Sequence, residues 1–193
     1  MTTDQGKMVN RLLELALERG AIRYGDFTLS SGRKSTYYFD GRLLSLDPEG
    51  AYLLGHALLP LLTDAGVSAV GGPTLGADPI VTAVATASWQ QGIPMPAFIV
   101  RKEAKGYGMG QMIEGPLPSA GASVAIVDDA CTTGGSLFHA IDATEEAGYK
   151  VGLVLAALDR NEGGSDAIRK RGYRFASLLT AGADGRIRPS DEV

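Results

Sequence analysis

The sequence predicts an α/β fold in which a mainly parallel central sheet is flanked by helices. From about residue 67 to residue 178, short apolar runs alternate with longer stretches of helical periodicity. The runs are continuously apolar, as expected for parallel strands that are covered on both faces. With 193 residues, 45% of them hydrophobic and 21% charged, the chain is long and apolar enough for one core, and a disordered or fibrous protein is excluded. We therefore expect a single domain over residues 1–193, in which residues 1–45 form a small elaboration.

The N-terminal elaboration is expected to contain a helix and a hairpin. Apolar residues at near-helical spacing predict an amphipathic helix over residues 7–19, which ends at Gly20. Aromatic or β-branched runs at residues 27–29 and 37–39 then predict a small hairpin. A leucine-rich helix is predicted over residues 48–65, and Pro60 should kink it or shorten it at its C-terminal side.

The remaining elements follow the alternation of strand and helix. Strands are predicted at residues 67–70, 97–100, 123–127, 151–158 and 173–178, and helices at residues 77–91, 135–147 and 165–171. Trp89 is expected to pack against the body of the protein. Because ligands bind at the carboxyl ends of such strands, the connections of interest are residues 71–77, 101–115, 128–135 and 159–164.

Composition limits the classes of partner. A formal net charge of -4 gives no global field for a nucleic acid, so anion binding must come from local clusters. The single cysteine, Cys131, excludes an internal disulfide and suits a reducing compartment. No secretory signal and no apolar stretch of the roughly 20 residues that a spanning helix needs is present. We expect a soluble cytoplasmic protein with neither a nucleic acid nor a membrane as partner.

The clearest motif is Val124-Ala-Ile-Val-Asp-Asp-Ala-Cys-Thr-Thr-Gly-Gly-Ser136, in which a strand turns into a helix. Backbone amides and hydroxyls at a helix N-terminus favour a phosphate, and Asp128 and Asp129 can accept hydrogen bonds from vicinal sugar hydroxyls. The motif predicts a ribose 5-phosphate site. The plainer interpretation is a capped helix beside solvated acids. A P-loop is disfavoured because its lysine is missing, and residues 106–110 lack the last glycine and the helix of a dinucleotide loop.

A second motif is cationic. Arg101, Lys102 and Lys105 follow a predicted strand and precede a glycine-rich stretch, so this loop is expected to move. A closing cationic loop would neutralise the charge that develops on a departing pyrophosphate and would exclude water. The alternative is an exposed loop with incidental charge.

These motifs resemble those of a known family. Residues 124–136 resemble the signature that binds phosphoribosyl pyrophosphate (PRPP) in type I phosphoribosyltransferases, while residues 101–110 and 24–40 resemble the catalytic loop and the hood of orotate phosphoribosyltransferases. The resemblance implies the type I phosphoribosyltransferase fold and transfer of ribose 5-phosphate from PRPP to orotate in pyrimidine (UMP) biosynthesis. It also implies Mg²⁺, held chiefly by substrate oxygens and waters with no protein metal ligands, and a homodimer with shared active sites.

The resemblance assigns roles by position. Arg101, Lys102 and Lys105 would be catalytic. PRPP would be bound by those three residues together with Tyr107, Asp128, Asp129, Ala130, Cys131, Thr132, Thr133, Gly134, Gly135 and Ser136. Orotate would be bound by Tyr38, Phe39, Thr132 and Arg160, with the arginine forming a forked pair with its carboxylate. Tyr38 and Phe39 have an alternative role, which is to pack the hood onto the core.

The sequence departs from the family pattern in three places. Tyr107 replaces a histidine, Ser30 replaces a frequent lysine, and residues 72–77 lack the usual aromatic-lysine pair. Arg33 or Lys34 could supply the missing cation, and Leu75 and Gly76 could present backbone amides to pyrophosphate. Two rival functions are a transferase for another base, such as a purine, and a PRPP-sensing regulator that binds nucleic acid. His56 and His139 lie in separate predicted helices and suggest no zinc site.

Overall fold

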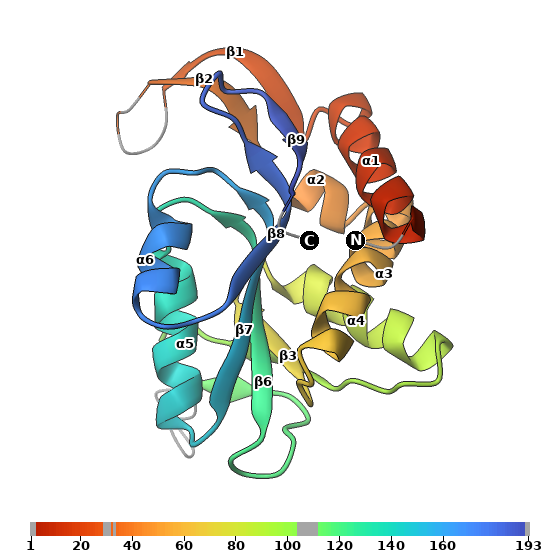
Figure 1. The fold of residues 1–193 in the computed structure, drawn as a ribbon, viewed down its shortest axis with the longest axis vertical. Helices are drawn as coiled ribbons and strands as arrows, with labels where there is room; N and C mark the ends of the chain where they lie inside the picture. The colour runs from red at the N-terminus through yellow and green to blue at the C-terminus, as the bar shows by residue number, and fades with distance from the viewer. Residues whose placement is uncertain (1–2, 29–31, 33, 104–111, 192–193) are drawn as a thin grey trace.

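The computed structural model describes residues 3–28, 32, 34–103 and 112–191 (Figure 1). Its helices are α1 (Thr3–Glu18), α2 (Arg42–Ser45), α3 (Pro48–Asp64), α4 (Asp78–Gln90), α5 (Gly135–Glu146) and α6 (Gly164–Lys170). Its strands are β1 (Ile22–Thr28), β2 (Lys34–Phe39), β3 (Val70–Pro73), β4 (Ala97–Val100), β5 (Ile113–Glu114), β6 (Ser123–Cys131), β7 (Lys150–Asp159), β8 (Phe175–Ala181) and β9 (Ile187–Pro189).

The main sheet has the strand order β5-β4-β3-β6-β7-β8-β9, as the predicted fold class requires. The five inner strands pair in parallel, whereas β5 and β9 pair antiparallel at the two edges. The chain runs from β3 outward to β4 and then returns to place β6 on the other side of β3. Strand order therefore reverses between β3 and β6, the position where sheets of this kind bind ligands.

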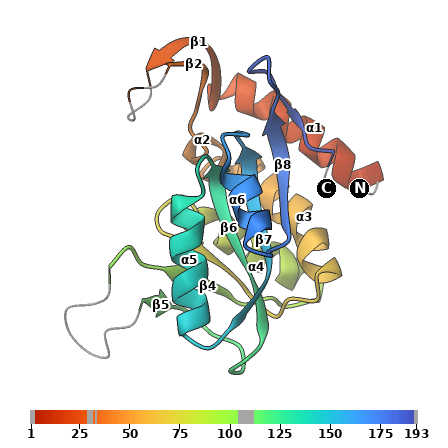
Figure 2. The same cartoon turned by 60° about the vertical axis from the view of Figure 1, so that its left-hand side comes forward.

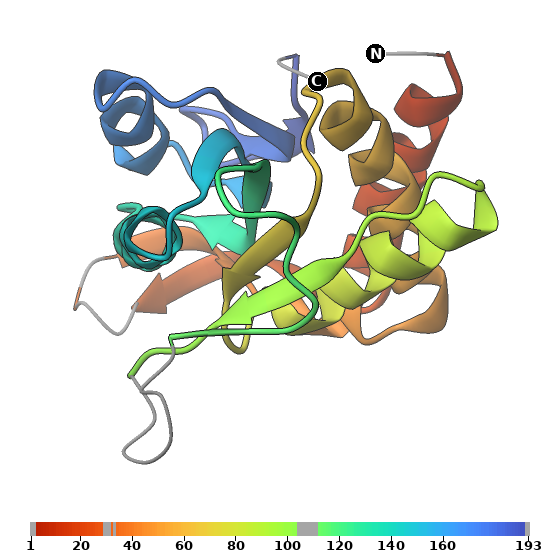
Figure 3. The same cartoon turned by 90° about the horizontal axis from the view of Figure 1, so that it is seen from below.

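Two apolar layers cover the sheet. The larger one buries residues of α1, α3 and α4 against one face, and the smaller one buries residues of α5 and α6 against the other. Figure 2 brings α5 and α6 forward, and in Figure 3 they lie opposite α3 and α4 across the sheet. Coverage on both faces explains why residues 124–127 of β6 and residues 151–158 of β7 form continuous apolar runs.

The hood is an antiparallel pair, β1 and β2, that stands over one end of the main sheet (Figure 1). The backbone N–H of Ile187 in β9 donates to the hydroxyl of Tyr24 in β1 at 3.0 Å. A side chain at Gly185 would collide with Thr36 of β2. The hood therefore rests on the C-terminal hairpin, far from it in the sequence.

Two local details differ from the predictions. Helix α3 spans nearly the whole predicted range and continues through Pro60 to Asp64, so the proline does not shorten it. Proline removes one hydrogen bond, but Leu58, Leu59 and Leu62 are fully buried around it and hold the last turn on the core. Trp89 does not pack, because its side chain is 75% exposed. Within the described residues, no helix is long and apolar enough to cross a membrane.

Candidate functional site

A cavity of about 490 Å³ lies at the carboxyl ends of β3, β6 and β7, below the hood. It is lined by Tyr38, Phe39, Asp40, Arg42, Pro73, Thr74, Leu75, Gly76, Lys102, Asp128, Asp129, Ala130, Thr132, Ser136 and Arg160. Residues predicted to bind PRPP, residues predicted to bind orotate, and Lys102 of the cationic loop thus line one cavity. Among the predicted residues, Arg101, Cys131, Thr133, Gly134 and Gly135 do not line it, and Lys105 and Tyr107 lie outside the described residues.

Strand β6 extends four residues beyond the predicted strand, to Cys131, and this extension contains both acids. Ser136 Oγ donates to Asp128 Oδ2 at 2.7 Å, and the N–H of Asp129 donates to Asp128 Oδ1 at 2.9 Å. These bonds tie the first turn of α5 to the acidic pair. The start of α5 is therefore held beside the carboxylates, an arrangement suited to recognising phosphate and hydroxyl groups side by side.

Two glycines shape the turn between β6 and α5, Gly134 within it and Gly164 of α6 packed against it. Gly134 has a φ of 83°, which residues with a side chain rarely adopt. A Cβ on Gly164 would lie 2.7 Å from the sulfur of Cys131 and from the nitrogen of Gly134. Cys131 is buried below this turn and has a pKa raised to about 12, chiefly by burial, so it is an inert packing residue.

The acidic pair is held at an energetic cost. Burial, and then the charge of Asp129, raise the pKa of Asp128 to about 7, and burial also raises the pKa of Asp129. The pair therefore holds more protons in the folded protein than in the unfolded chain between about pH 4 and pH 7. The free energy of unfolding must fall as pH rises through this range.

Asp128→Asn is therefore expected to stabilise the free protein at pH 8, by about 1 kcal/mol. The amide can accept from the N–H of Asp129 and donate to Ser136, so both contacts are kept without the charge. At pH 4 the gain should disappear because the native carboxyl is then neutral. Thermal unfolding at both pH values checks this, with exposed Asp142→Asn as control. A lower melting temperature at pH 8 would contradict it.

Two glycines bring backbone against the acids. A Cβ on Gly76 would lie 2.8 Å from an oxygen of Asp128 and of Asp129, and a Cβ on Gly41 would lie 2.7 Å from the Cβ of Asp129. No side chain at position 76 fits without moving the carboxylates. A lysine at this position would therefore have to displace the carboxylates of Asp128 and Asp129.

Arg42 is a cation of the cavity that the sequence reasoning missed. It donates from Nε and Nη2 to the two carboxylate oxygens of Asp40 at 2.8 and 3.0 Å. This bond lowers the pKa of Asp40, and the charge of Arg42 opposes the rise in the pKa of Asp129. Lys34 instead donates to Thr28 within the hood, and Arg33 lies outside the described residues. In the sequence, Arg42 stands in Asp40-Gly-Arg42 directly after the aromatic strand, a pattern that does not by itself indicate a binding site.

Arg160 directly follows β7 and lines the cavity together with Tyr38 and Phe39, at what we call its aromatic end. Its side chain is only 8% exposed, its guanidinium lies 4.7 Å from the ring centre of Tyr37, and its Nε donates to Glu162 at 2.9 Å. Its Nη2 is buried and has no hydrogen-bond partner within the described part of the chain. A buried donor with unused capacity suits a planar carboxylate.

The aromatic residues of β2 divide between core and cavity. Phe39 is buried in the larger apolar layer and also lines the cavity, so the packing role applies to it at least. Tyr38 is partly exposed. Its ring lies 5.8 Å from that of Phe27, and the guanidinium of Arg23 lies 5.0 Å from its centre. These contacts hold the flat ring of Tyr38 in place, on the side of the cavity that the hood forms.

The cationic segment is anchored where the structure describes it. Arg101 donates from its N–H to the carbonyl of Met112 and from Nη1 to Glu114, both at 2.8 Å. His139 Nε2 donates to the carbonyl of Arg101 at 2.8 Å. In this arrangement Arg101 anchors the segment, and Lys102 reaches the cavity. Among the described residues, no group of three or more acids, histidines and cysteines could hold a metal ion.

Comparisons with known proteins point to one family. No protein-family model matches the chain. The chain is 44% identical over 179 residues to an orotate phosphoribosyltransferase of a Nostoc species, which covers 93% of this chain and 86% of the relative. It is 48% identical over 161 residues to one of Thermosynechococcus vestitus, which covers 83% and 85%.

Solved structures agree. The orotate phosphoribosyltransferase of Mycobacterium tuberculosis superposes with a TM-score of 0.76 at 38% identity, over 92% of this chain and 96% of that one. The same enzyme in complex with PRPP gives 0.72 at 34% identity, with the same coverage. An adenine phosphoribosyltransferase of Thermoanaerobacter pseudethanolicus, 17% identical with a TM-score of 0.61 over 88% and 99%, shares the fold alone. The chain belongs to the orotate phosphoribosyltransferase family.

Proposed function

We propose that the cavity transfers the ribose 5-phosphate group of PRPP to orotate, giving orotidine 5′-monophosphate and pyrophosphate in UMP biosynthesis. The observation that carries the proposal is that one hollow joins an acidic pair at a helix N-terminus to a buried arginine with an unused donor. The carbon-oxygen bond to pyrophosphate breaks as the ring nitrogen of orotate bonds to the same ribose carbon. Because that nitrogen is already acidic, positioning and electrostatics supply most of the catalysis.

The ribose phosphate end of PRPP is assigned to the β6–α5 connection. The amides and hydroxyls of residues 132–136 bind the 5-phosphate, and Asp128 and Asp129 accept from the ribose hydroxyls, with Ala130 and Cys131 shaping the turn. Ionised acids are needed for this role. Burial raises the pKa of both acids in the free protein, and cationic groups that assemble on the pair would lower these pKa values and favour the ionised form.

Orotate is assigned to the end of the cavity below the hood. Tyr38 and Phe39 offer ring surfaces to the planar base, Thr132 lines the same cavity, and Arg160 pairs with the carboxylate. A purine carries no carboxylate, so a buried arginine would be left unpaired beside it. This is the feature that favours orotate over a purine base.

Pyrophosphate is assigned to the cationic end. Arg42 and Lys102 line this end of the cavity, and Leu75 and Gly76 can present backbone amides there. Lys102 belongs to the cationic segment that also contains Arg101, Lys105 and Tyr107. In the partner's site or its own, this segment would neutralise the leaving group. Arg42 takes the part of the lysine that the chain lacks.

Arg42→Ala is expected to raise the KM for PRPP by about tenfold or more, because a charge-assisted hydrogen bond contributes about 1.5–3 kcal/mol. The KM for orotate should change little. Steady-state kinetics with each substrate varied in turn measures both values. Arg19→Ala is the matched control, since Arg19 makes a similar surface pair with Asp47 away from the cavity. An unchanged KM for PRPP would remove Arg42 from the site.

The residues present fit Mg²⁺ that is held mainly by substrate. Asp128 and Asp129 are the acids nearest the ribose position, and Mg²⁺ usually keeps several waters and takes few protein carboxylates. The ion would supply charge neutralisation on pyrophosphate.

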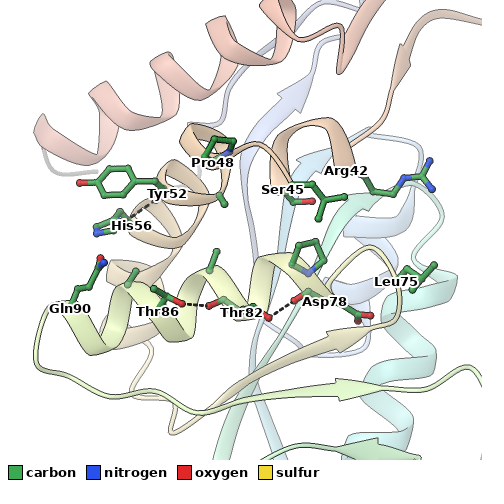
Figure 4. A pocket seen from close by; sticks show the side chains of 15 residues that line it. Arg42, Ser45, Pro48, Tyr52, His56, Leu75, Asp78, Thr82, Thr86 and Gln90 are labelled. Carbon is green, nitrogen blue, oxygen red and sulfur yellow. Dashed lines mark hydrogen bonds between the residues drawn. The ribbon is translucent and has the colours of Figure 1, made fainter.

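We also propose that a second copy of the chain covers an apolar groove between α3 and α4 (Figure 4). The groove has a volume of about 820 Å³, and Leu75 at its end is 69% exposed. Thr82 and Thr86 donate their hydroxyls to carbonyls of their own helix, so they present methyl groups. Arg42 and Leu75 line both groove and cavity, so a copy seated here would border the active site.

Thr86→Lys is expected to weaken this association at least tenfold, because it places a charge in the middle of an apolar interface. Sedimentation velocity over a range of protein concentrations measures the change. Thr63→Lys is the control, because Thr63 is also an exposed helical threonine bonded to its own helix but lies outside the groove. A dimer that resists Thr86→Lys would place the interface elsewhere.

The function is tested with a panel of bases. Orotate, uracil, adenine and hypoxanthine are each incubated with PRPP, with and without Mg²⁺, and pyrophosphate release is measured. We expect Mg²⁺-dependent turnover with orotate alone, by an enzyme that works in the cytoplasm without nucleic acid or membrane. Turnover with a purine and none with orotate would overturn the proposal, and tight nucleic-acid binding without turnover would favour the regulator.

A further inference from the structure

We propose that Glu162 is a positioning residue, which orients Arg160 so that its free donors meet the carboxylate of the base. The inference rests on the proposed function, since it takes the base to carry a carboxylate that Arg160 binds. It concerns a residue that touches neither substrate. Glu162 would act on the substrate through the guanidinium of Arg160.

The guanidinium of Arg160 is held on two sides. Its Nε donates to Glu162 Oε1 at 2.9 Å, and its Cζ lies over the ring of Tyr37, 4.7 Å from the ring centre. The pair is largely buried, with 8% of the arginine side chain and 19% of the glutamate side chain exposed. An arginine presents its donors in a rigid planar fork, so holding Nε and Cζ also restricts where Nη2 can point.

The backbone below this pair is equally fixed. The N–H of Arg160 donates to the carbonyl of Cys131 at 2.9 Å. Asn161 adopts a φ of 52°, and its Nδ2 donates to Thr180 Oγ1 and to the carbonyl of Ala181 at 2.9 and 2.7 Å. The loop therefore has little freedom to re-aim the guanidinium. Orientation depends on the two contacts of the side chain itself.

The orphaned donor indicates the direction. Nη2 is buried without a partner in the described part of the chain, a state that costs free energy unless a ligand completes it. Arg160 lines the cavity together with Tyr38 and Thr132. Glu162 thus occupies one donor of the fork, and Nη2 is left unpaired on a side chain that lines the cavity, as a donor for a planar acid.

Two opposite effects of Glu162 can be separated. Its negative charge would repel a bound carboxylate, so a purely electrostatic role predicts that both Glu162→Gln and Glu162→Ala tighten orotate binding. A positioning role predicts a split, because glutamine keeps an oxygen acceptor for Nε and alanine does not. The two variants differ in geometry at equal loss of charge.

The experiment compares KM and kcat of Glu162→Ala and Glu162→Gln, each with orotate and PRPP varied in turn. We expect alanine to raise the KM for orotate about tenfold and glutamine to raise it less than about threefold, with the KM for PRPP unchanged. Glu145→Ala is the control, since Glu145 accepts a hydrogen bond from Tyr173 away from the cavity. If the alanine variant does not fold, Glu162→Asp, which is one methylene shorter, carries the same expectation.

Arg160→Leu separates the inference from the function below it. If Arg160→Leu impairs orotate use and neither Glu162→Ala nor Glu162→Asp does, the positioning role is overturned and the proposed function stands. If Arg160→Leu leaves the KM for orotate unchanged, the assignment of the base is itself wrong. Equal tightening by glutamine and alanine would replace positioning with charge repulsion.

Discussion

Arg160→Leu is expected to lower kcat/KM for orotate by about 10²- to 10³-fold, because removing one partner of a buried hydrogen-bonded charge pair costs about 2–5 kcal/mol. The KM for PRPP should change far less, since Arg160 lies at the aromatic end of the cavity. Leucine keeps an apolar surface over the ring of Tyr37, which limits the loss of packing. Steady-state kinetics with a melting temperature for each variant measures both effects.

Arg160→Lys is the informative companion. Lysine keeps the positive charge but presents no planar fork and cannot hold Glu162 and a carboxylate in one plane. We expect it to recover only a minor part of the lost activity. Full activity in the lysine variant would mean that charge alone suffices, and full activity in the leucine variant would place the carboxylate elsewhere.

The inner sheet could be predicted because its signal is local. Continuous apolar runs mark β4, β6 and β7 without any knowledge of their neighbours. The strand predicted at residues 67–70 overlaps β3 only at Val70, because β3 continues through two glycines and a proline, which are rare in strands. The edge strands β5 and β9 are two and three residues long and carry polar or proline residues, so no periodicity identifies them. They are strands only because a neighbour offers an unpaired edge.

The end of β6 shows the same dependence on tertiary context. Aspartates are poor strand residues, so the predicted strand stopped at Val127. In the structure the pairing with β7 continues, with Asp128 opposite Ala156 and Cys131 opposite Asp159. The parallel neighbour therefore carries two acids to the rim of the cavity in extended backbone. Local propensity could not anticipate that extension.

The site was predictable where one segment holds the chemistry. Residues 124–136 contain acids, hydroxyls, glycines and the start of a helix in order, and five of them line one cavity: Asp128, Asp129, Ala130, Thr132 and Ser136. Arg42 and Glu162 could not be found in this way. Each acquires its place from a contact with Asp40 or Arg160 and from a fold that joins β2, β6 and β7. A charged residue after a strand is ordinarily solvated, so its type alone carries no signal.

Gly76→Ala is expected to lower kcat/KM for PRPP by about 10²-fold, because a displacement near 1 Å in a catalytic site can cost that much. The added Cβ would lie 2.8 Å from an oxygen of Asp128 and from one of Asp129. Those atoms are ends of side chains, so the carboxylates can turn away while the backbone stays in place. The damage should fall on PRPP binding and leave the fold intact.

The fold and the site are separated by measuring thermal unfolding beside PRPP affinity. Exchange of glycine for alanine also restricts the unfolded chain, which offsets part of any strain, so a melting temperature within a few degrees of the parent is expected. Gly76→Lys adds the cation that the family pattern places in this loop. We expect it to be no more active than Gly76→Ala, because the clash arises at Cβ and precedes any benefit from the charge. A lysine variant with activity restored to the parent level would show that the loop can open, and that Arg42 is not needed as its substitute.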